Sequence, residues 1–198
     1  MNKAQSMTIS EWTDALSSAA PIPGGGGVGA LLGVLSACLA SMVGNLTVEK
    51  KGYEAFSLEC EKLIQKANEL RNRLLQLIDE DAIAFEALMK AWKTGANDQA
   101  YANASEPAAR TIYEIVTLLD ILNVFKEKGN KNVLSDVGVG ACCAAAALET
   151  SRINILVNLR YIGAPNVRKE FEMLLDVLIP EGIKRARDLM KQVERELQ

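Results

Sequence analysis

A run of four glycines followed by nineteen residues without a charge constrains the fold more than any other feature of this chain. The uncharged stretch extends from Val28 to Leu46, and the glycines before it are Gly24, Gly25, Gly26 and Gly27. Backbone can approach a neighbouring group very closely at glycine, because no Cβ stands in the way. The stretch that follows is rich in Gly, Ala and Ser. We therefore expect a helix that lies unusually close to another helix or to a flat ligand.

The composition favours one soluble globular domain over residues 1–198, with about half of the residues apolar and a quarter charged. A net charge of −3 and an aromatic content of 5% give no electrostatic or stacking surface for nucleic acid. The chain has no histidine. Proton transfer near neutral pH must therefore use other side chains with shifted pKa values, and a metal site built on imidazole is excluded. We expect no metal.

The four cysteines form no C-x-x-C pair, and all lie in apolar helical contexts: Cys38, Cys60, Cys142 and Cys143. They are predicted to be buried free thiols of a cytoplasmic protein. The first residues show no export signal. Val28–Leu46 is barely long enough to span a membrane and is too rich in small residues to insert well, so we expect no membrane partner.

The pattern predicts an all-α fold, an antiparallel up-and-down bundle of five to six helices. The first expected helix is short and capped, from Thr8 to Ala19. Longer helices are expected at Val28–Leu46, Tyr53–Trp92 and Ser135–Ile162. Between the last two of these we expect a helix that begins near Asp98, restarts at Ser105 and ends at Lys128, and the final helix of the chain should bend near Pro180. The stretch from Gly138 to Leu148 is a second run of small residues. We expect the two small-residue helices to pack face to face.

Asp81 interrupts an otherwise apolar seam that steps by three and four residues through Phe56, Cys60, Leu63, Ala67, Leu70, Leu74, Leu77, Phe85, Leu88 and Trp92. A carboxylate on such a seam is costly unless it is paired or functional. Two interpretations stay open: a surface-edge carboxylate where the seam drifts, or a general acid or base with a raised pKa in a cleft.

Other polar residues also carry two interpretations each. The glycine run is either a tight turn or a ligand pocket at a helix N-terminus. Asn154 and Asn158 lie one turn apart. They either fix the helix register or recognise a heteroaromatic ligand through its hydrogen-bond donors and acceptors. Asp136 is either a helix cap or a site residue, and it lies about 27 Å from Asn154 along one helix. Lys50 and Lys51 are either solvated charges at a helix end or a binding surface for a carboxylate-rich substrate tail.

Four segments in this order resemble the cyclodeaminase/cyclohydrolase family of folate enzymes, which includes the C-terminal domain of formiminotransferase-cyclodeaminase and stand-alone methenyltetrahydrofolate cyclohydrolases. The matching segments are PIPGGGGVGAL (21–31), MVGNLTVEKKGYE (42–54), DEDAIAFEALMKA (79–91), and GNKNVLSDVGVGA (129–141) with INILVNL (153–159). The resemblance implies an all-helical enzyme that acts on the one-carbon unit between N5 and N10 of tetrahydrofolate. It implies no cofactor beyond the tetrahydrofolate substrate.

The resemblance also assigns roles on this chain. The glycine run would form a wall against the pterin, Asp81 or Asp136 would move protons, and Lys50 and Lys51 would face the glutamate tail. Asn45, Asn154 and Asn158 would bind or position the ligand. Because Asp136 and Asn154 are far apart, some of these residues would serve different ends of the site, or the site would be shared between subunits, and we therefore expect a homodimer. The chain departs from similar sequences at Gly27, where Ser is usual, at Lys128, where His is common, and at Lys93-Thr94-Gly95.

Three functions follow as hypotheses. The first is a cyclodeaminase that converts 5-formiminotetrahydrofolate to 5,10-methenyltetrahydrofolate and ammonia, with any formiminotransferase partner on a separate chain. The alternative is a methenyltetrahydrofolate cyclohydrolase. The third is a non-catalytic folate-binding helical dimer.

Overall fold

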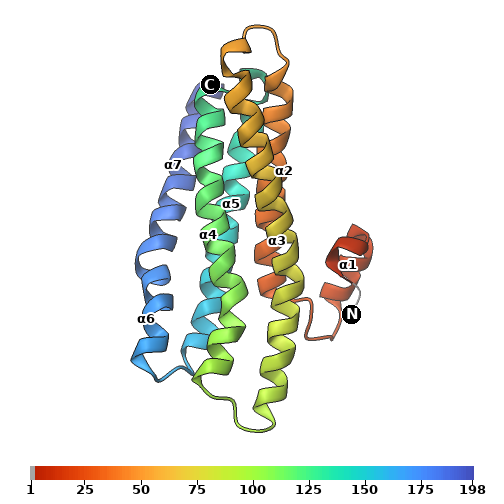
Figure 1. The fold of residues 1–198 in the computed structure, drawn as a ribbon, viewed down its shortest axis with the longest axis vertical. Coiled ribbons are helices and arrows are strands. Elements are labelled where there is room, and N and C mark those ends of the chain that lie inside the picture. The colour runs from red at the N-terminus through yellow and green to blue at the C-terminus, as the bar shows by residue number, and fades with distance from the viewer. Residues whose placement is uncertain (1–2) are drawn as a thin grey trace.

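The chain forms an elongated bundle of long helices in the computed structural model, which describes residues 3–198 (Figure 1). The helices are α1 (Ile9–Ser17), α2 (Gly25–Val48), α3 (Ser57–Trp92), α4 (Asp98–Lys128), α5 (Leu134–Leu159), α6 (Pro165–Met173) and α7 (Ile179–Leu197). A π-helical turn, Leu174–Leu178, joins α6 to α7, so the two form one bent rod near Pro180, as predicted. No strand occurs within residues 3–198, and the predicted all-α bundle is confirmed.

Short connections join consecutive rods and make neighbours antiparallel. Gly52 and Gly95 have φ values of 94° and 93°, and they turn the chain between α2 and α3 and between α3 and α4. Glycine adopts this left-handed conformation without the steric cost that other residues incur. The up-and-down order follows from these tight turns.

The two small-residue helices, α2 and α5, pack face to face in the centre, as predicted. Ser36 Oγ of α2 donates a hydrogen bond of 2.8 Å to the carbonyl oxygen of Gly140 on α5. Ala37 and Ala144 are fully buried, so no bulky side chain separates the two backbones. Close approach of this kind is what a run of Gly, Ala and Ser permits.

The α3 seam is buried over most of its length, with Leu70, Leu74 and Leu77 at most 1% exposed. The seam prediction fails at Trp92, which is half-exposed because α3 extends past the end of the packed core.

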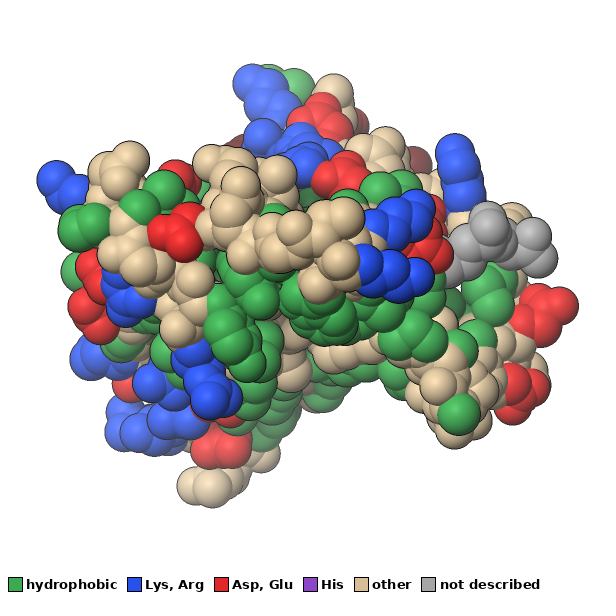
Figure 2. Space-filling view, turned by 90° about the horizontal axis from the view of Figure 1, so that it is seen from below, with side chains coloured by type: hydrophobic (Ala, Val, Ile, Leu, Met, Phe, Trp, Pro, Cys, Tyr) green, Lys and Arg blue, Asp and Glu red, His purple; other side chains and the backbone are tan. Residues whose placement is uncertain are grey.

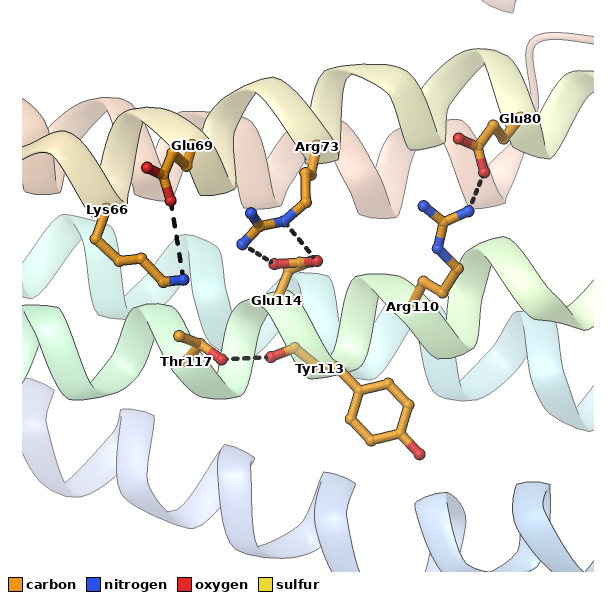
Figure 3. Close-up of polar contacts among 8 residues, drawn as sticks. All are labelled: Lys66, Glu69, Arg73, Glu80, Arg110, Tyr113, Glu114 and Thr117. Atoms are coloured by element: carbon orange, nitrogen blue, oxygen red, sulfur yellow. Dashed lines mark hydrogen bonds and ion pairs between the residues drawn. The ribbon is translucent and has the colours of Figure 1, made fainter.

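Two ion pairs join the outer sides of α3 and α4, one between Arg73 and Glu114 and one between Arg110 and Glu80 (Figure 3). Partly exposed pairs of this kind add little to stability.

Two predicted helix starts are wrong. α2 begins at Gly25 rather than Val28, because the glycines form its first turn instead of a loop before it. α4 does not restart at Ser105 but runs without a break through Pro107. Packing overrides the local cost of proline there, since Ser105 and Pro107 are both buried against the bundle.

Helix α1 protrudes beside α3 (Figure 1). The predicted capping box is present: Glu11 N donates to Thr8 Oγ1, and Thr8 N donates to the Glu11 carboxylate. Only Trp12 of α1 is buried. A hydrogen bond of 2.8 Å from Ala4 N to Asp79 Oδ1 ties the N-terminal segment to α3.

Two helical stretches, Gly25–Val48 and Lys131–Leu159, are long and apolar enough to cross a membrane. Their most apolar windows are 56% and 50% buried inside the bundle, which is typical of the core helices of a soluble protein.

The prediction of buried thiols is correct only for Cys60, because Cys38 and Cys142 lie on outward-facing positions and Cys143 is half-buried.

Candidate active site

The first turn of α2 places Gly26 and Gly27 against the side chain of Asp81 on α3. Gly27 N donates a hydrogen bond of 3.0 Å to Asp81 Oδ2, across 54 residues of sequence. A Cβ at Gly26 would lie 1.9 Å from Asp81 Oδ1, so no other residue fits there without moving the carboxyl group. The glycine backbone therefore forms a wall that lies directly against the Asp81 carboxyl group.

The half-buried Asp81 carboxyl group has an altered proton affinity. Burial raises its pKa to about 6, because the charged form loses hydration, and the hydrogen bond from Gly27 opposes this shift. A carboxyl with this pKa exchanges protons close to neutral pH. Asp81 is thus suited to acid–base chemistry in a chain that has no histidine.

Two asparagines of α5 face the same glycine turn. Asn154 Nδ2 donates to the carbonyl oxygen of Thr150 at 2.8 Å, and Asn158 Nδ2 donates to that of Asn154 at 3.3 Å. These bonds orient the amides and leave both side-chain oxygens as acceptors. Asn154 Oδ1 lies opposite Gly25, 3.5 Å from where a Cβ would stand.

Together these groups line an open cleft of about 140 Å³, which we call the glycine cleft. Its lining is Pro21, Ile22, Gly24, Gly25, Gly26, Asp81, Phe85, Ala104, Asn154, Val157 and Asn158. The structure therefore brings together Gly24 to Gly26, Asp81, Asn154 and Asn158 of the predicted site, with Gly27 buried directly behind.

The remaining predicted site residues lie at the other end of the bundle. Lys50 follows the end of α2, and this helix rises about 35 Å from Gly25 to Val48. Its Nζ donates to Asn130 Oδ1 at 2.7 Å, and Asn130 N donates to Thr47 Oγ1 at 3.0 Å. Lys51 follows in the adjoining turn. Within one chain, therefore, neither lysine lies at the glycine cleft.

Asn45 and Asp136 belong to that far end as well. Asn45 is exposed and lines a different groove, between α2 and α3. Asp136 lies in the first turn of α5, and its predicted capping role is wrong because no side chain caps that helix. The predicted separation of Asp136 from Asn154 is confirmed, since both lie on the one helix α5.

Sequence reasoning missed four wall residues, Pro21, Ile22, Ala104 and Val157, and assigned Phe85 only to the apolar seam. Phe85 is one helical turn beyond Asp81, so the spacing alone would have indicated it. Ala104 comes from α4, and no local pattern points to it. Within residues 3–198, no group of three or more Cys, Asp or Glu side chains has the arrangement of a metal site.

These features define a class of protein: an all-helical bundle in which a glycine-walled cleft holds a proton-exchanging carboxyl and two amides. The formiminotransferase-cyclodeaminase family matches residues 8–176, and the chain belongs to this family. It is thus an enzyme of the cyclodeaminase or methenyltetrahydrofolate cyclohydrolase type in folate one-carbon metabolism.

Individual relatives bear different names. A methenyltetrahydrofolate cyclohydrolase from Methylorubrum extorquens is 35% identical over 184 residues, which span 85% of this chain and 88% of that protein. The crystal structure of formiminotetrahydrofolate cyclodeaminase from Thermotoga maritima has a TM-score of 0.88 and 30% identity, over 96% of this chain and 98% of that one. Formimidoyltransferase-cyclodeaminase from Gallus gallus is 26% identical over 81% of this chain, which spans only 32% of that protein.

Proposed function

We propose that this chain is a methenyltetrahydrofolate cyclohydrolase, which adds water to 5,10-methenyltetrahydrofolate and yields 10-formyltetrahydrofolate. The observation that carries the proposal is the half-buried Asp81 carboxyl, whose pKa is raised to about 6 against a wall of glycine backbone. The 35% identity to a cyclohydrolase of nearly the same length favours this activity over the cyclodeaminase.

In the proposed reaction, water adds to the carbon between N5 and N10, and Asp81 takes the proton that the water loses. The product of this step is a tetrahedral carbon that bears a hydroxyl group. The C–N5 bond then breaks, its electrons pass to N5, and protonated Asp81 supplies a proton to that nitrogen. The hydroxyl loses its proton to solvent and becomes the formyl carbonyl. A carboxyl with a pKa near the working pH serves both steps.

The glycine wall and the two asparagines would hold the pterin. Glycine backbone offers a flat surface for a flat ring. The amide nitrogens of Asn154 and Asn158 bond to backbone carbonyls, so their side-chain oxygens would accept hydrogen bonds from the ring N–H groups. No metal or redox group is required, because the chemistry is proton transfer and water addition.

A homodimer is part of the proposal. Ligand pockets usually exceed about 300 Å³, and the glycine cleft of one chain has about 140 Å³. Beside it lies an exposed surface that we call the α2–α5 apolar face: Leu35, Met42, Leu46, Val139, Ile153 and Val157. Figure 2 shows hydrophobic side chains gathered in a hollow along one side of the bundle. Val157 belongs to both surfaces, so a second copy on this face would also close the cleft.

The dimer would also give the far-end residues a role. If the two copies pack antiparallel about a two-fold axis, the Asn45, Lys50, Lys51 and Asp136 end of one copy lies beside the glycine turn of the other. A symmetric pair of this kind has two equivalent sites, each with residues from both chains.

The cyclodeaminase is the second candidate, and the likeness to the Thermotoga maritima structure favours it. It uses the same carboxyl to protonate the departing amine, and it requires a formiminotransferase on another chain. The two activities are separated by giving purified protein either 5,10-methenyltetrahydrofolate or 5-formiminotetrahydrofolate and following the near-ultraviolet absorbance of the methenyl form.

We expect the first substrate to lose its absorbance faster than in buffer. Absorbance that grows with the second substrate, together with matched ammonia release, would establish the cyclodeaminase instead. Asp81→Asn is the control for both arms, and we expect its rate to fall by about 100-fold or more. A wild-type protein that binds folate but turns over neither substrate would be the non-catalytic dimer.

A further inference from the structure

Aromatic side chains gather at the end of the bundle that carries the glycine cleft. The rings of Tyr101 and Tyr161 are stacked, with centroids 4.8 Å apart and planes at 18°. Phe85, which lines the cleft, packs edge-on against Trp92 with centroids 5.8 Å apart. The chain has only ten aromatic residues, so four of them at one end mark this region as unusual.

The register of the helices places the tyrosine pair at the mouth of the cleft. Tyr101 is three residues before Ala104 on α4, and Tyr161 is three residues after Asn158 at the end of α5. Ala104 and Asn158 both line the cleft. Tyr101 shares a helix face with Ala104, and Tyr161 lies in the turn just past the end of α5 and stacks on Tyr101, so both rings lie outward from the cleft wall. Tyr161 N continues that turn with a hydrogen bond of 2.9 Å to the carbonyl oxygen of Asn158.

The turn that carries Tyr161 is anchored from two sides. Asp98 Oδ2 accepts hydrogen bonds from Gly163 N at 2.9 Å and from Ala164 N at 2.6 Å. Arg168 Nη1 donates to the carbonyl oxygens of Leu159 and Ile162, both at 2.8 Å. These bonds fix the connection between α5 and α6 in place, so the groups it presents are preorganised.

Arg160 is a cation at this mouth that the chain leaves available. Its guanidinium lies over the ring of Tyr161, 5.9 Å from the centroid. Within residues 3–198 it has no carboxylate within ion-pair distance. By contrast, Arg168 pairs with Glu172, and Arg110 pairs with Glu80. The tyrosine orients Arg160 without neutralising it.

We propose that Arg160, held over Tyr161, binds the carboxylates of the glutamate end of the folate substrate. This inference rests on the proposed function. The reacting carbon lies between the pterin and the benzoyl-glutamate part of the molecule. With the carbon at Asp81 and the pterin against the glycine wall, the other part leaves through the mouth past Phe85. A guanidinium suits this position because its planar fork matches a carboxylate with two hydrogen bonds.

The test compares substrates with and without the glutamate: 5,10-methenyltetrahydrofolate and 5,10-methenyltetrahydropteroate. In Arg160→Ala we expect KM for the glutamate-bearing substrate to rise about tenfold, with kcat within about twofold of wild type. KM for the pteroate should not change. Arg160→Lys keeps the charge without the fork and should restore part of the loss. Arg152→Ala is the matched control, since Arg152 is an exposed arginine on the same helix that lines a groove on the α7 side.

Several results would overturn the assignment. One is an Arg160→Ala variant that raises KM equally for both substrates, or for neither. Another is a glutamate-specific rise in KM that appears in Lys50→Ala or Lys51→Ala and not in Arg160→Ala, which would place the tail across the dimer interface.

Equilibrium binding of 5-formyltetrahydrofolate and its pteroate counterpart separates this inference from the proposed function. If nothing is turned over but Arg160→Ala weakens binding of the folate alone, the reaction is wrong and the binding assignment stands. If the protein turns over the substrate with a KM that is insensitive to Arg160, the proposed reaction stands and the binding assignment is wrong. If the protein neither turns over nor binds the folate, both are rejected.

Discussion

At the scale of the residue, Asp81 is governed by the balance between lost hydration and one hydrogen bond. Because its pKa is raised to about 6, the carboxyl is largely ionised at pH 7.5 and largely protonated at pH 5. Only the ionised form can take a proton from water. We therefore expect kcat/KM for methenyltetrahydrofolate to fall below about pH 6, by about tenfold for each further pH unit.

A series of initial rates between pH 4.5 and 8, corrected for the uncatalysed reaction, measures this profile. The neighbouring carboxyl of Asp79 binds Ala4 N and lies outside the cleft lining, so Asp79→Asn should keep the same profile. A wild-type rate that stays level down to pH 4.5 would exclude Asp81 as the base.

The same pKa shift has a consequence for stability. The folded state holds the Asp81 proton more tightly than the unfolded state, so its contribution is fully present below about pH 4 and is lost as pH rises through about 6. We expect Asp81→Asn to match wild type at pH 4 and to exceed it by about 1–3 kcal/mol at pH 7.5. Denaturant unfolding at both pH values, at one protein concentration, measures the difference. A less stable variant at pH 7.5 would mean that another group compensates the buried charge.

The sequence predicted this residue and not its surroundings. Asp81 stands out because a carboxylate occupies a position on an apolar seam, which local spacing reveals. Its hydrogen-bond partner, Gly27, is 54 residues away, and its position depends on how α2 and α3 pack. A one-dimensional pattern contains no information on that packing, so the sequence alone does not decide between a surface-edge carboxylate and an acid–base group.

At the scale of the element, local signals predicted helix identity well and helix boundaries less well. The capping box at Thr8 and the small-residue character of α2 and α5 are properties of neighbouring residues, and both predictions are confirmed. The start of α2 and the continuity of α4 are set by tertiary contacts that outweigh the usual behaviour of glycine and proline. Local propensity is only a weak guide when such contacts exist.

Gly44 tests whether the small residues of α2 are required for helix packing. A Cβ at this position would lie 2.4 Å from Ile64 Cγ1 and 2.9 Å from Phe125 Cζ. Phe125 is almost fully buried and has no space to move into. We expect Gly44→Ala to lower the free energy of unfolding by about 1–3 kcal/mol, although alanine favours the helix.

Urea unfolding followed by circular dichroism measures this change. The adjacent Asn45→Ala is the matched control, because Asn45 is exposed and its replacement should alter stability by less than about 0.5 kcal/mol. A Gly44→Ala variant as stable as the control would show that α3 and α4 yield readily to a larger side chain.

At the scale of the whole molecule, the predicted site residues separate into two groups at opposite ends of the bundle. The resemblance to folate enzymes selected both groups, but one chain cannot bring them together across the length of α2, about 35 Å. The sequence predicted this conflict from the separation of Asp136 and Asn154 on one helix. It could not predict that an apolar surface runs between the two ends, because the exposure of Leu35 and Ile153 depends on the whole bundle.

The α2–α5 apolar face is the surface that would join two copies of the chain. If the α2–α5 apolar face joins two copies, Leu35→Glu buries a carboxylate in the interface. That carboxylate would have neither water nor a partner to stabilise its charge. We expect light scattering to show a dimer for wild type and a monomer for this variant, with methenyltetrahydrofolate turnover lost in parallel and helix content unchanged. Leu58→Glu is the matched control, since Leu58 is an exposed leucine on α3 outside this face. A Leu35→Glu variant that remains an active dimer would mean that another surface joins the copies, and a wild-type monomer with full activity would mean that one chain suffices for the site.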